Sequence, residues 1–293
     1  MERCVPGSAS GNSLADCASR YARSASQVQS DGMTHGHGQA EILELDAEVL
    51  REQTAGIVSW LPVEQEPREI VDLAAGTGAG TFALLERFPA AQVTAVDASA
   101  AHLEQLRAKG GGVRTVVADL DDEVWPELGT PELVWASASM HHLADPDAAL
   151  RKVRALLAPD GLFAVVEVAG QPRFLPGDAV EEQLHAAADR LHADQLPHRG
   201  ADWGPMLRKA GFTVAAEVTI DVEIEGSRTP GVGRYALGVL SRLRHSPAVA
   251  ELSAEDLTAL DQLLDTAHPH SLLRRTDLVL HTQRRVWAAH REN

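Results

Sequence analysis

The stretch that decides the fold is Ile70–Gly80, which reads IVDLAAGTGAG. It begins as an apolar run typical of a buried strand, continues into a turn of small residues, and leads into a helical pattern of apolar residues. Small residues in such a turn allow a ligand to approach the backbone, and the start of the helix offers free N–H groups. A glycine-rich turn is weak evidence by itself, because many α/β proteins use one only for packing.

Further strands follow this turn at regular intervals. Short apolar runs alternate with amphipathic helical patterns, and these runs occupy residues 70–75, 93–96, 113–118, 133–136 and 162–168. This alternation is typical of a parallel sheet with helices on both faces. Later in the chain, helical patterns cover 178–196 and 201–211, and two further strands are expected at 214–224 and 278–289. We therefore predict an α/β fold with a Rossmann-like, doubly wound, mostly parallel seven-stranded sheet, an antiparallel last strand and a helical cap.

The composition narrows the class of protein. The 293 residues include 26 Lys and Arg against 42 Asp and Glu, a net charge of −16, which argues against a broad basic face for nucleic acid. The two cysteines, Cys4 and Cys17, exclude a disulfide-built scaffold. No apolar run has the roughly 18 residues of a membrane span, and no secretory signal opens the chain. We expect a cytoplasmic protein without nucleic-acid or membrane partners, and its oligomeric state is not indicated.

Acidic residues recur at the ends of the first three strands. Asp97 ends the second strand 21 residues after Gly76, where a carboxylate can accept hydrogen bonds from both ribose hydroxyls. Asp72 lies within the first strand and Asp119 follows the third. The dinucleotide fingerprint fails because Thr81 holds its last position, and the acids would repel a pyrophosphate. A cationic, phosphate-free adenosine ligand fits better than NAD(P), although an NAD(P)-dependent oxidoreductase is the first alternative.

The stretch from Ile70 to Val168 resembles the class I S-adenosylmethionine-dependent methyltransferases. Asp72–Gly78 is similar to their glycine-rich first motif, Val93–Asp97 to their ribose-binding strand end, and Asp119-Leu120 to their adenine-contacting acid. The run LLAPDG at 156–161 is similar to the loop before their fifth strand. Ala74 departs from the pattern, because the family usually has glycine there. The chain from Met33 onward is more loosely similar to small-molecule methyltransferases of actinobacterial type.

The resemblance implies S-adenosylmethionine as cofactor and a small molecule as methyl acceptor. The cofactor-binding residues it implies are Asp72, Ala74, Ala75, Gly76, Thr77, Gly78, Asp97, Ala98, Ala118, Asp119, Leu120, Ala136 and Ser137. The acceptor atom would be an oxygen, a nitrogen or an activated carbon. Two alternatives have the same fold but a different activity: a non-catalytic binding protein, and a cyclase-type enzyme.

The fourth strand ends in the run ASASMHH at 136–142, where this fold separates cofactor from acceptor. Either His141 or His142 could act as a general base, because an imidazole has a reference pKa of about 6.5. We expect one ring to point toward the acceptor and the other toward a helix that begins near Asp145; the alternative is that both are structural. The Asn/Asp-Pro-Pro-aromatic motif of amino-DNA methyltransferases is absent here, as are the acidic ligands of metal-dependent catechol-type enzymes. We therefore expect no metal.

Other side chains allow two interpretations each. His35 and His37 could bind a metal, close over the cofactor or belong to a polar lead-in. A functional and a plain structural role are both open for a further set of side chains. The histidines His185, His192 and His198 are either solvated, which we favour, or face the acceptor pocket, and the aromatic residues Trp203 and Tyr235 either line the pocket or pack in the core. The cluster Arg151, Lys152 and Arg154 is most simply a solvated surface.

The expected organisation is one methyltransferase domain behind a tail. Residues 1–32 contain few apolar side chains and are expected to form a flexible N-terminal tail, with a helix at 13–28 as the alternative. Residues 33–293 are expected to form the domain. Its predicted parts are a lead helix at 33–68, a cofactor-binding core at 69–170, a substrate region at 171–275 with a cap at 231–267, and a terminal strand at 276–293.

Overall fold

The computed structural model describes residues 38–291. The predicted tail at 1–32 lies outside the described residues, and so do His35 and His37. Between Gly38 and Arg291, no helix is long and apolar enough to cross a membrane.

Helices and strands alternate through the first half of the described chain. The helices are α2 (Gln39–Val49), α3 (Arg51–Trp60), α4 (Ala79–Arg87), α5 (Ala100–Ala108), α6 (Pro146–Leu156), α7 (Ala179–Gln195), α8 (Trp203–Lys209), α9 (Gly231–Arg244) and α10 (Ala254–Leu264), with short 3₁₀ turns η1 (Met140–His142), η2 (Pro247–Glu251) and η3 (Leu272–Arg274). The strands are β1 (Glu69–Leu73), β2 (Gln92–Asp97), β3 (Arg114–Val117), β4 (Leu133–Ser137), β5 (Leu162–Val168), β6 (Phe212–Glu225) and β7 (Val279–Arg291).

The seven strands form one sheet in the order β3-β2-β1-β4-β5-β7-β6. The first five pair in parallel, and β7 lies antiparallel between β5 and β6. The strand order reverses direction at β1, so the carboxyl ends of β1 and β4 flank the point where an open α/β sheet has its crevice. The predicted fold class, including the antiparallel last strand, is confirmed.

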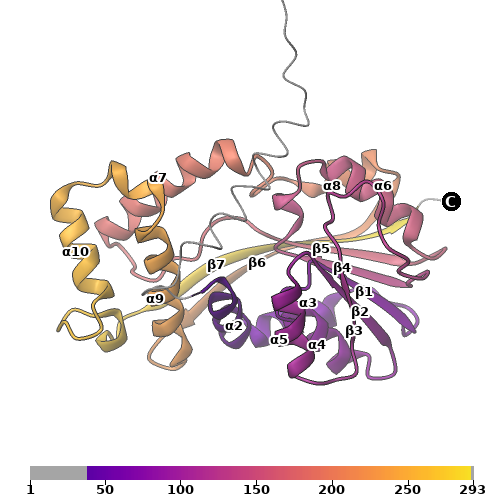
Figure 1. Ribbon diagram of the computed structural model, residues 1–293, viewed down its shortest axis with the longest axis horizontal. Helices are drawn as coiled ribbons and strands as arrows, with labels where there is room; N and C mark the ends of the chain where they lie inside the picture. Colours follow the sequence, from indigo (N-terminus) through magenta and orange to yellow (C-terminus); the bar gives the residue numbers. More distant parts are fainter. Residues whose placement is uncertain (1–37, 292–293) are drawn as a thin grey trace, which may run out of the picture. The chain divides into compact units, whose positions relative to one another are not determined.

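Two helical layers cover the parallel strands (Figure 1). On one face, α3 and α4 bring Ile57 and Leu84 against the apolar side chains of the sheet, among them Trp135. On the other face, α6 and α8 bring Leu150 and Trp203 into a second buried cluster. The strands β1, β2, β4 and β5 are buried on both faces, which explains why the sequence shows continuous apolar runs there, whereas the edge strand β3 is partly exposed.

The last two strands are longer than the sheet that they complete. Pairing between β5 and β7 stops at Val168 and Arg284, yet β7 continues pairing with β6 as far as Val279 and Glu225. Because β5 runs parallel to β1 and β4, this overhang extends past the carboxyl edge of the sheet, as Figure 1 shows. A third apolar cluster, built from α2, α7, α9 and α10, covers the overhang. The cap is therefore held at the edge where the loops after β1, β2 and β4 lie.

The expected lead helix is two helices, separated at Leu50. The backbone of Leu50 leaves the helical region at φ −100° and ψ 17°. Before this break, Leu45 and Val49 pack into the cap cluster, and after it, Ile57 and Val58 pack onto the sheet. One straight helix cannot present its apolar stripe to both clusters, so the chain changes direction between them.

Candidate functional site

A cavity of about 460 Å³ lies at the carboxyl edge of the sheet, between the strand ends and the cap. The turn after β1 and the ends of β2 and β4 form one wall. Residues of α2 and α9, together with the chain around the end of α7, form the opposite wall. This volume falls within the usual range of small-molecule pockets, about 300–1,000 Å³.

The turn after β1 has a left-handed backbone at three positions. Gly76 and Gly78 have φ of 55° and 99°, and Ala74 has φ of 52°. A Cβ on Gly78 would lie 2.9 Å from a side-chain carbon of Leu106, so both conformation and space require glycine there. Ala74 tolerates the same backbone region at a cost of about 1 kcal/mol. Ala74, where the family usually has glycine, is therefore a strained residue in the wall of the cavity.

Asp97, at the end of β2, is anchored by the backbone around it. Its Oδ2 accepts a hydrogen bond from the Gly76 N–H, and its Oδ1 accepts one from the Ser99 N–H, both at 2.8 Å. Burial on its own would raise the pKa of this carboxyl, but His102 at 3.4 Å and the two amides outweigh burial and lower it. Asp97 is thus an ionised acceptor, held rigidly at the cavity wall.

Asp72 is a second acid in the same wall, and none of the ion pairs found between Gly38 and Arg291 includes it. Its side chain is buried and accepts a hydrogen bond from the Thr81 hydroxyl at 2.6 Å. Burial, together with the negative charge of Asp97, raises the pKa of Asp72 to about 7. A positive group bound in the cavity would compensate this carboxylate, because opposite charge favours the ionised form.

Two hydrogen-bond donors in the wall have no partner among residues 38–291. They are the indole Nε1 of Trp135 and the hydroxyl of Ser139, both buried and both in the cavity lining. A Cβ on Gly80 would lie 2.5 Å from that indole nitrogen, so the bare glycine is what allows the close approach. Unsatisfied donors, an acid without a cationic partner among the described residues and a backbone that allows close contact together fit a polar, positively charged ligand, and S-adenosylmethionine has this chemistry.

The loop after β4 is clamped by Glu167 of β5. One carboxylate oxygen accepts hydrogen bonds from the backbone N–H groups of Ser139, Met140 and His141, at 2.8–3.3 Å. The other lies 2.6 Å from Nδ1 of His141. His141 is therefore buried against Glu167 and does not line the cavity. The carboxylate fixes the loop and the ring together.

His142 takes the other direction and lines the cavity. Its ring lies against that of His141, with centroids 4.1 Å apart. Partial burial of the ring, followed by the electrostatic effect of the neighbouring His141, Arg199 and Arg242, lowers the pKa of His142 to about 3. The imidazole is consequently neutral at pH 7, where it can exchange hydrogen bonds but has little basicity.

The cap side of the cavity is lined by cations that sequence analysis did not identify. Arg199 follows α7 and Arg242 lies on α9, with His192 and Gln171 beside them in the lining. Nδ1 of His192 lies 3.0 Å from a terminal guanidinium nitrogen of Arg199. No motif surrounds these residues, and only the packing of α7 and α9 over the sheet brings them together.

About half of the predicted cofactor-binding residues lie in this cavity. Those that line it are Asp72, Ala74, Ala75, Gly76, Thr77, Asp97 and Ser137. Those outside its lining are Gly78, Ala98, Ala118, Asp119, Leu120 and Ala136. Ala118 donates its N–H to the Asp97 carbonyl, which places Asp119 at the same sheet edge but with an exposed side chain. Leu120 and Ala136 are buried in the core instead.

The remaining histidine and aromatic side chains lie partly in the core and partly in the cavity lining. His185 is buried in the cap, His192 lines the cavity, and His198 lies in neither place. Tyr235 lines the cavity while it packs edge-on against Phe174 and donates a hydrogen bond to Asp46, so both of its interpretations hold. Trp203, the first residue of α8, is fully buried in the core.

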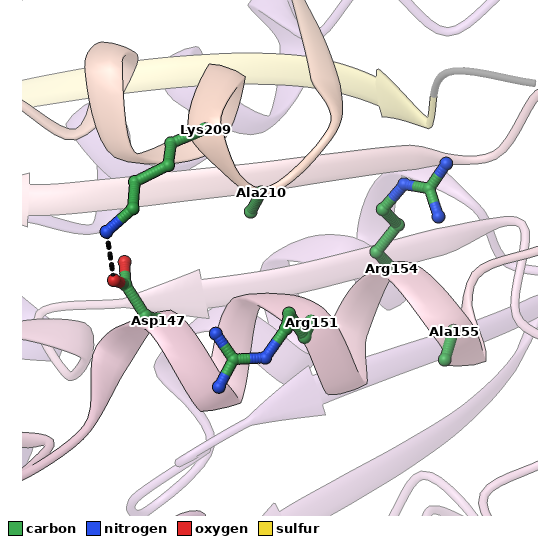
Figure 2. A pocket seen from close by; sticks show the side chains of 6 residues that line it. All are labelled: Asp147, Arg151, Arg154, Ala155, Lys209 and Ala210. Carbon is green, nitrogen blue, oxygen red and sulfur yellow. Dashed lines mark hydrogen bonds and ion pairs between the residues drawn. The ribbon is translucent and has the colours of Figure 1, made fainter.

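A second hollow, of about 410 Å³, lies between α6 and α8 (Figure 2). Its cations are largely engaged by the protein itself: Lys209 pairs with Asp147, and Arg154 donates to the Gly211 carbonyl. Arg154 thus ties α6 to the turn after α8, which differs from the solvated surface expected for it. Because these charges already have partners, this hollow is a poorer ligand site than the cavity under the cap.

Comparison with known proteins gives a consistent result. Residues 71–163 match the model of the methyltransferase domain. A trans-aconitate 2-methyltransferase from Acidovorax sp. (strain JS42) is 33% identical over 159 residues, 54% of this chain and 59% of that protein. A malonyl-[acyl-carrier protein] O-methyltransferase from Halorhodospira halophila is 33% identical over 157 residues, 52% of this chain and 50% of that protein. The chain thus spans only about half to three fifths of these relatives' lengths.

The chain carries a class I S-adenosylmethionine-dependent methyltransferase domain. The family resemblance inferred from the sequence is therefore confirmed. Two solved structures share this fold. One is a candidate methyltransferase from Bacillus halodurans, with a TM-score of 0.53 and 16% identity over 83% of this chain and 100% of that one. The other is the YcgJ protein from Bacillus subtilis, with a TM-score of 0.50 and 15% identity over 83% of this chain and 99% of that one.

Proposed function

We propose that this protein transfers a methyl group from S-adenosylmethionine to a small molecule bound in the cavity under the cap. The observation that carries the proposal is the pair of acids, Asp72 and Asp97, beside the left-handed turn after β1 and within one cavity. The names of the relatives support a small or carrier-bound acceptor, and one of those names specifies O-methylation.

The proposed roles of the wall follow from its chemistry. Asp97 accepts hydrogen bonds from the ribose hydroxyls with the carboxylate lone pairs that Gly76 and Ser99 leave free. The buried Asp72 compensates positive charge, and the turn from Ala74 to Gly78 brings backbone N–H groups close to the ligand. Asp119, exposed at the same edge, is proposed to accept from the adenine amino group.

Bound S-adenosylmethionine supplies a methyl group already activated by its sulfonium sulfur. The protein's task is then mainly to hold the acceptor in line and to keep water out, because proximity and alignment reduce the barrier without acid–base chemistry. The cap covers one side of the cavity, and the loop after β4, which Glu167 holds in place, forms part of another side. With its pKa lowered to about 3, His142 is a weak base, which favours an acceptor that is already a good nucleophile at neutral pH.

The test combines identification of bound molecules with an acceptor screen. Native mass spectrometry of the purified protein, followed by calorimetry with S-adenosylhomocysteine, should show binding in the micromolar range. Incubation with methyl-labelled S-adenosylmethionine and a panel of small oxygen, nitrogen and carbon acceptors should then transfer label to at least one of them.

The alternatives give different results in the same experiments. Binding of S-adenosylhomocysteine without label transfer to any acceptor would favour the non-catalytic or cyclase-type alternative. Binding of NADH by fluorescence titration, without binding of S-adenosylhomocysteine, would favour the oxidoreductase.

A further inference from the structure

Arg199 is a partly buried cation that the protein itself leaves incompletely satisfied. One terminal guanidinium nitrogen lies 3.0 Å from His192 Nδ1, and arginine can only donate in this contact. The Nε atom is buried and has no acceptor. Since Nδ1 of His192 accepts, the proton of the neutral ring is on Nε2, and this histidine offers a second donor rather than a counter-charge.

Arg242 approaches the same cavity from α9. No ion pair or hydrogen bond of its side chain is found among residues 38–291. Arg244, two residues further along the same helix but outside the cavity lining, holds Asp261 through two nitrogens at 2.8 and 3.2 Å. Other surface arginines behave like Arg244, for example Arg190 with Glu251 and Arg234 with Glu48.

No described carboxylate forms an ion pair with Arg199 or Arg242. Other described arginines, such as Arg151 and Arg274, also make no ion pair, so what distinguishes Arg199 and Arg242 is that both line the cavity. The acids that act on Arg199, Asp189 and Glu167, make no ion pair with it, and Glu167 is occupied by the loop after β4. Arg199 and Arg242 also disfavour protonation of both His142 and His192, so their positive potential reaches across the cavity.

We propose that Arg199 and Arg242 form an anion subsite that holds a carboxylate or phosphate group of the methyl acceptor. The inference rests on the proposed function, because it takes the cavity to be the acceptor site. A guanidinium donates to two oxygens of such a group at once. Arg199 is partly buried and Arg242 is exposed, so the contact to Arg199 is expected to be the stronger of the two. The acceptor is therefore an organic acid or a phosphate ester rather than a neutral or cationic amine.

The decisive experiment measures anion binding without turnover. Calorimetry is performed on the full chain saturated with S-adenosylhomocysteine, with succinate, succinamide and inorganic phosphate as probes. The ¹⁵N-labelled arginine Nε–H signals are followed in parallel, and the Arg199 and Arg242 signals are assigned by their loss in the variants. We expect the wild type to bind succinate or phosphate but not succinamide, with both assigned signals shifting. Which of the two anions binds more tightly identifies the acceptor group.

Matched variants separate the subsite from general effects. Arg199→Gln and Arg242→Gln should each weaken anion binding at least tenfold and leave S-adenosylhomocysteine affinity within about twofold. Arg244→Gln, on the same helix as Arg242, should leave both unchanged. Arg199→Lys keeps the charge and should reduce anion affinity by less than Arg199→Gln does. This variant still tests the subsite if the glutamine variant fails to fold.

Two results would overturn the subsite. One is a wild type that binds neither anion at millimolar concentration; the other is anion binding that survives in both glutamine variants. A wild type that binds anions through the two arginines but does not bind S-adenosylhomocysteine would instead refute the proposed methyl transfer and leave the subsite standing.

Discussion

The two walls of the cavity carry opposite charge and have different origins. The sheet-side wall presents Asp72 and Asp97 at the ends of short parallel strands. The cap-side wall presents Arg199 and Arg242 on segments separated by the long β6 strand. A local sequence motif therefore builds the sheet-side wall, whereas the cap-side wall exists only because the overhang of β6 and β7 supports the cap helices.

Two charged groups near the sheet side differ from Arg242 in how the protein holds them. Asp97 in the sheet-side wall and Glu167 on β5 accept hydrogen bonds from nearby backbone amides and are held before any ligand arrives. Arg242 is left without a protein partner among the described residues. Preorganisation on the sheet side suits a constant ligand, and unpaired donors on the cap side suit the group that distinguishes one acceptor from another.

The largest expected effect is on stability, at Glu167, which holds the loop after β4. Glu167→Ala removes the acceptor of three buried amides and of the His141 ring, and should lower the free energy of unfolding by about 3 kcal/mol or more. Urea unfolding measures this loss. The control Glu104→Ala, on an exposed position of α5, should change it by less than about 0.5 kcal/mol. Equal effects would mean that the loop after β4 does not depend on this clamp.

The second effect tests the sheet-side wall alone. Asp97→Ala should weaken S-adenosylhomocysteine binding roughly tenfold or more, because a charged acceptor for the ribose is lost. Succinate binding by the cap-side arginines should change little. Calorimetry on the same variant gives both values, and an unaltered S-adenosylhomocysteine affinity would remove the ribose role of Asp97.

The third prediction concerns pH and follows from Asp72. Its pKa, raised to about 7, means that the carboxyl is largely protonated at pH 5.5 and must lose this proton to compensate a cationic ligand. S-adenosylmethionine affinity should therefore rise as pH increases from 5.5 to 7.5, at most about tenfold per pH unit, and level off above 7. Asp72→Asn should flatten the profile. A profile that is already flat in the wild type would show that Asp72 does not face the positive charge.

The same pKa shifts determine how stability responds to pH. Because the folded state holds the Asp72 proton up to about pH 7, the contribution of Asp72 to stability is largest at low pH and is lost as pH rises through 7. His142 acts in the opposite sense: its depressed pKa of about 3 makes its contribution fall as pH drops below 6.5. Unfolding curves of Asp72→Asn and His142→Ala between pH 4 and 8 should therefore depart from the wild type in opposite directions.

The smallest effect tests strain in the turn after β1. Ala74→Gly should raise the free energy of unfolding slightly, by at most about 1 kcal/mol, since φ of 52° costs alanine more than glycine. Ala75→Gly, next in the chain and without positive φ, should lower it by about 0.5–1 kcal/mol. Thermal melting of the two variants checks the opposite signs, and a shared sign would mean that Ala74 is not strained.

The sequence alone determined the sheet and its ligand edge. The apolar runs after Ile70 define buried parallel strands, and the small-residue turn with Asp97 marks the crevice, because strand periodicity and backbone conformation are properties of neighbouring residues. It also narrowed the base candidates to His141 and His142. It could not choose between them, because the choice depends on Glu167, which is 26 residues from His141 along the chain.

Only the tertiary structure decided which distant side chains meet. The lead helix divides at Leu50 because its two halves face different clusters, and Arg199 and Arg242 share a cavity because α7 and α9 pack over the overhang. Neither outcome has a local signature: both follow from burying apolar surface between elements far apart in the sequence, a constraint that periodicity along one segment does not contain.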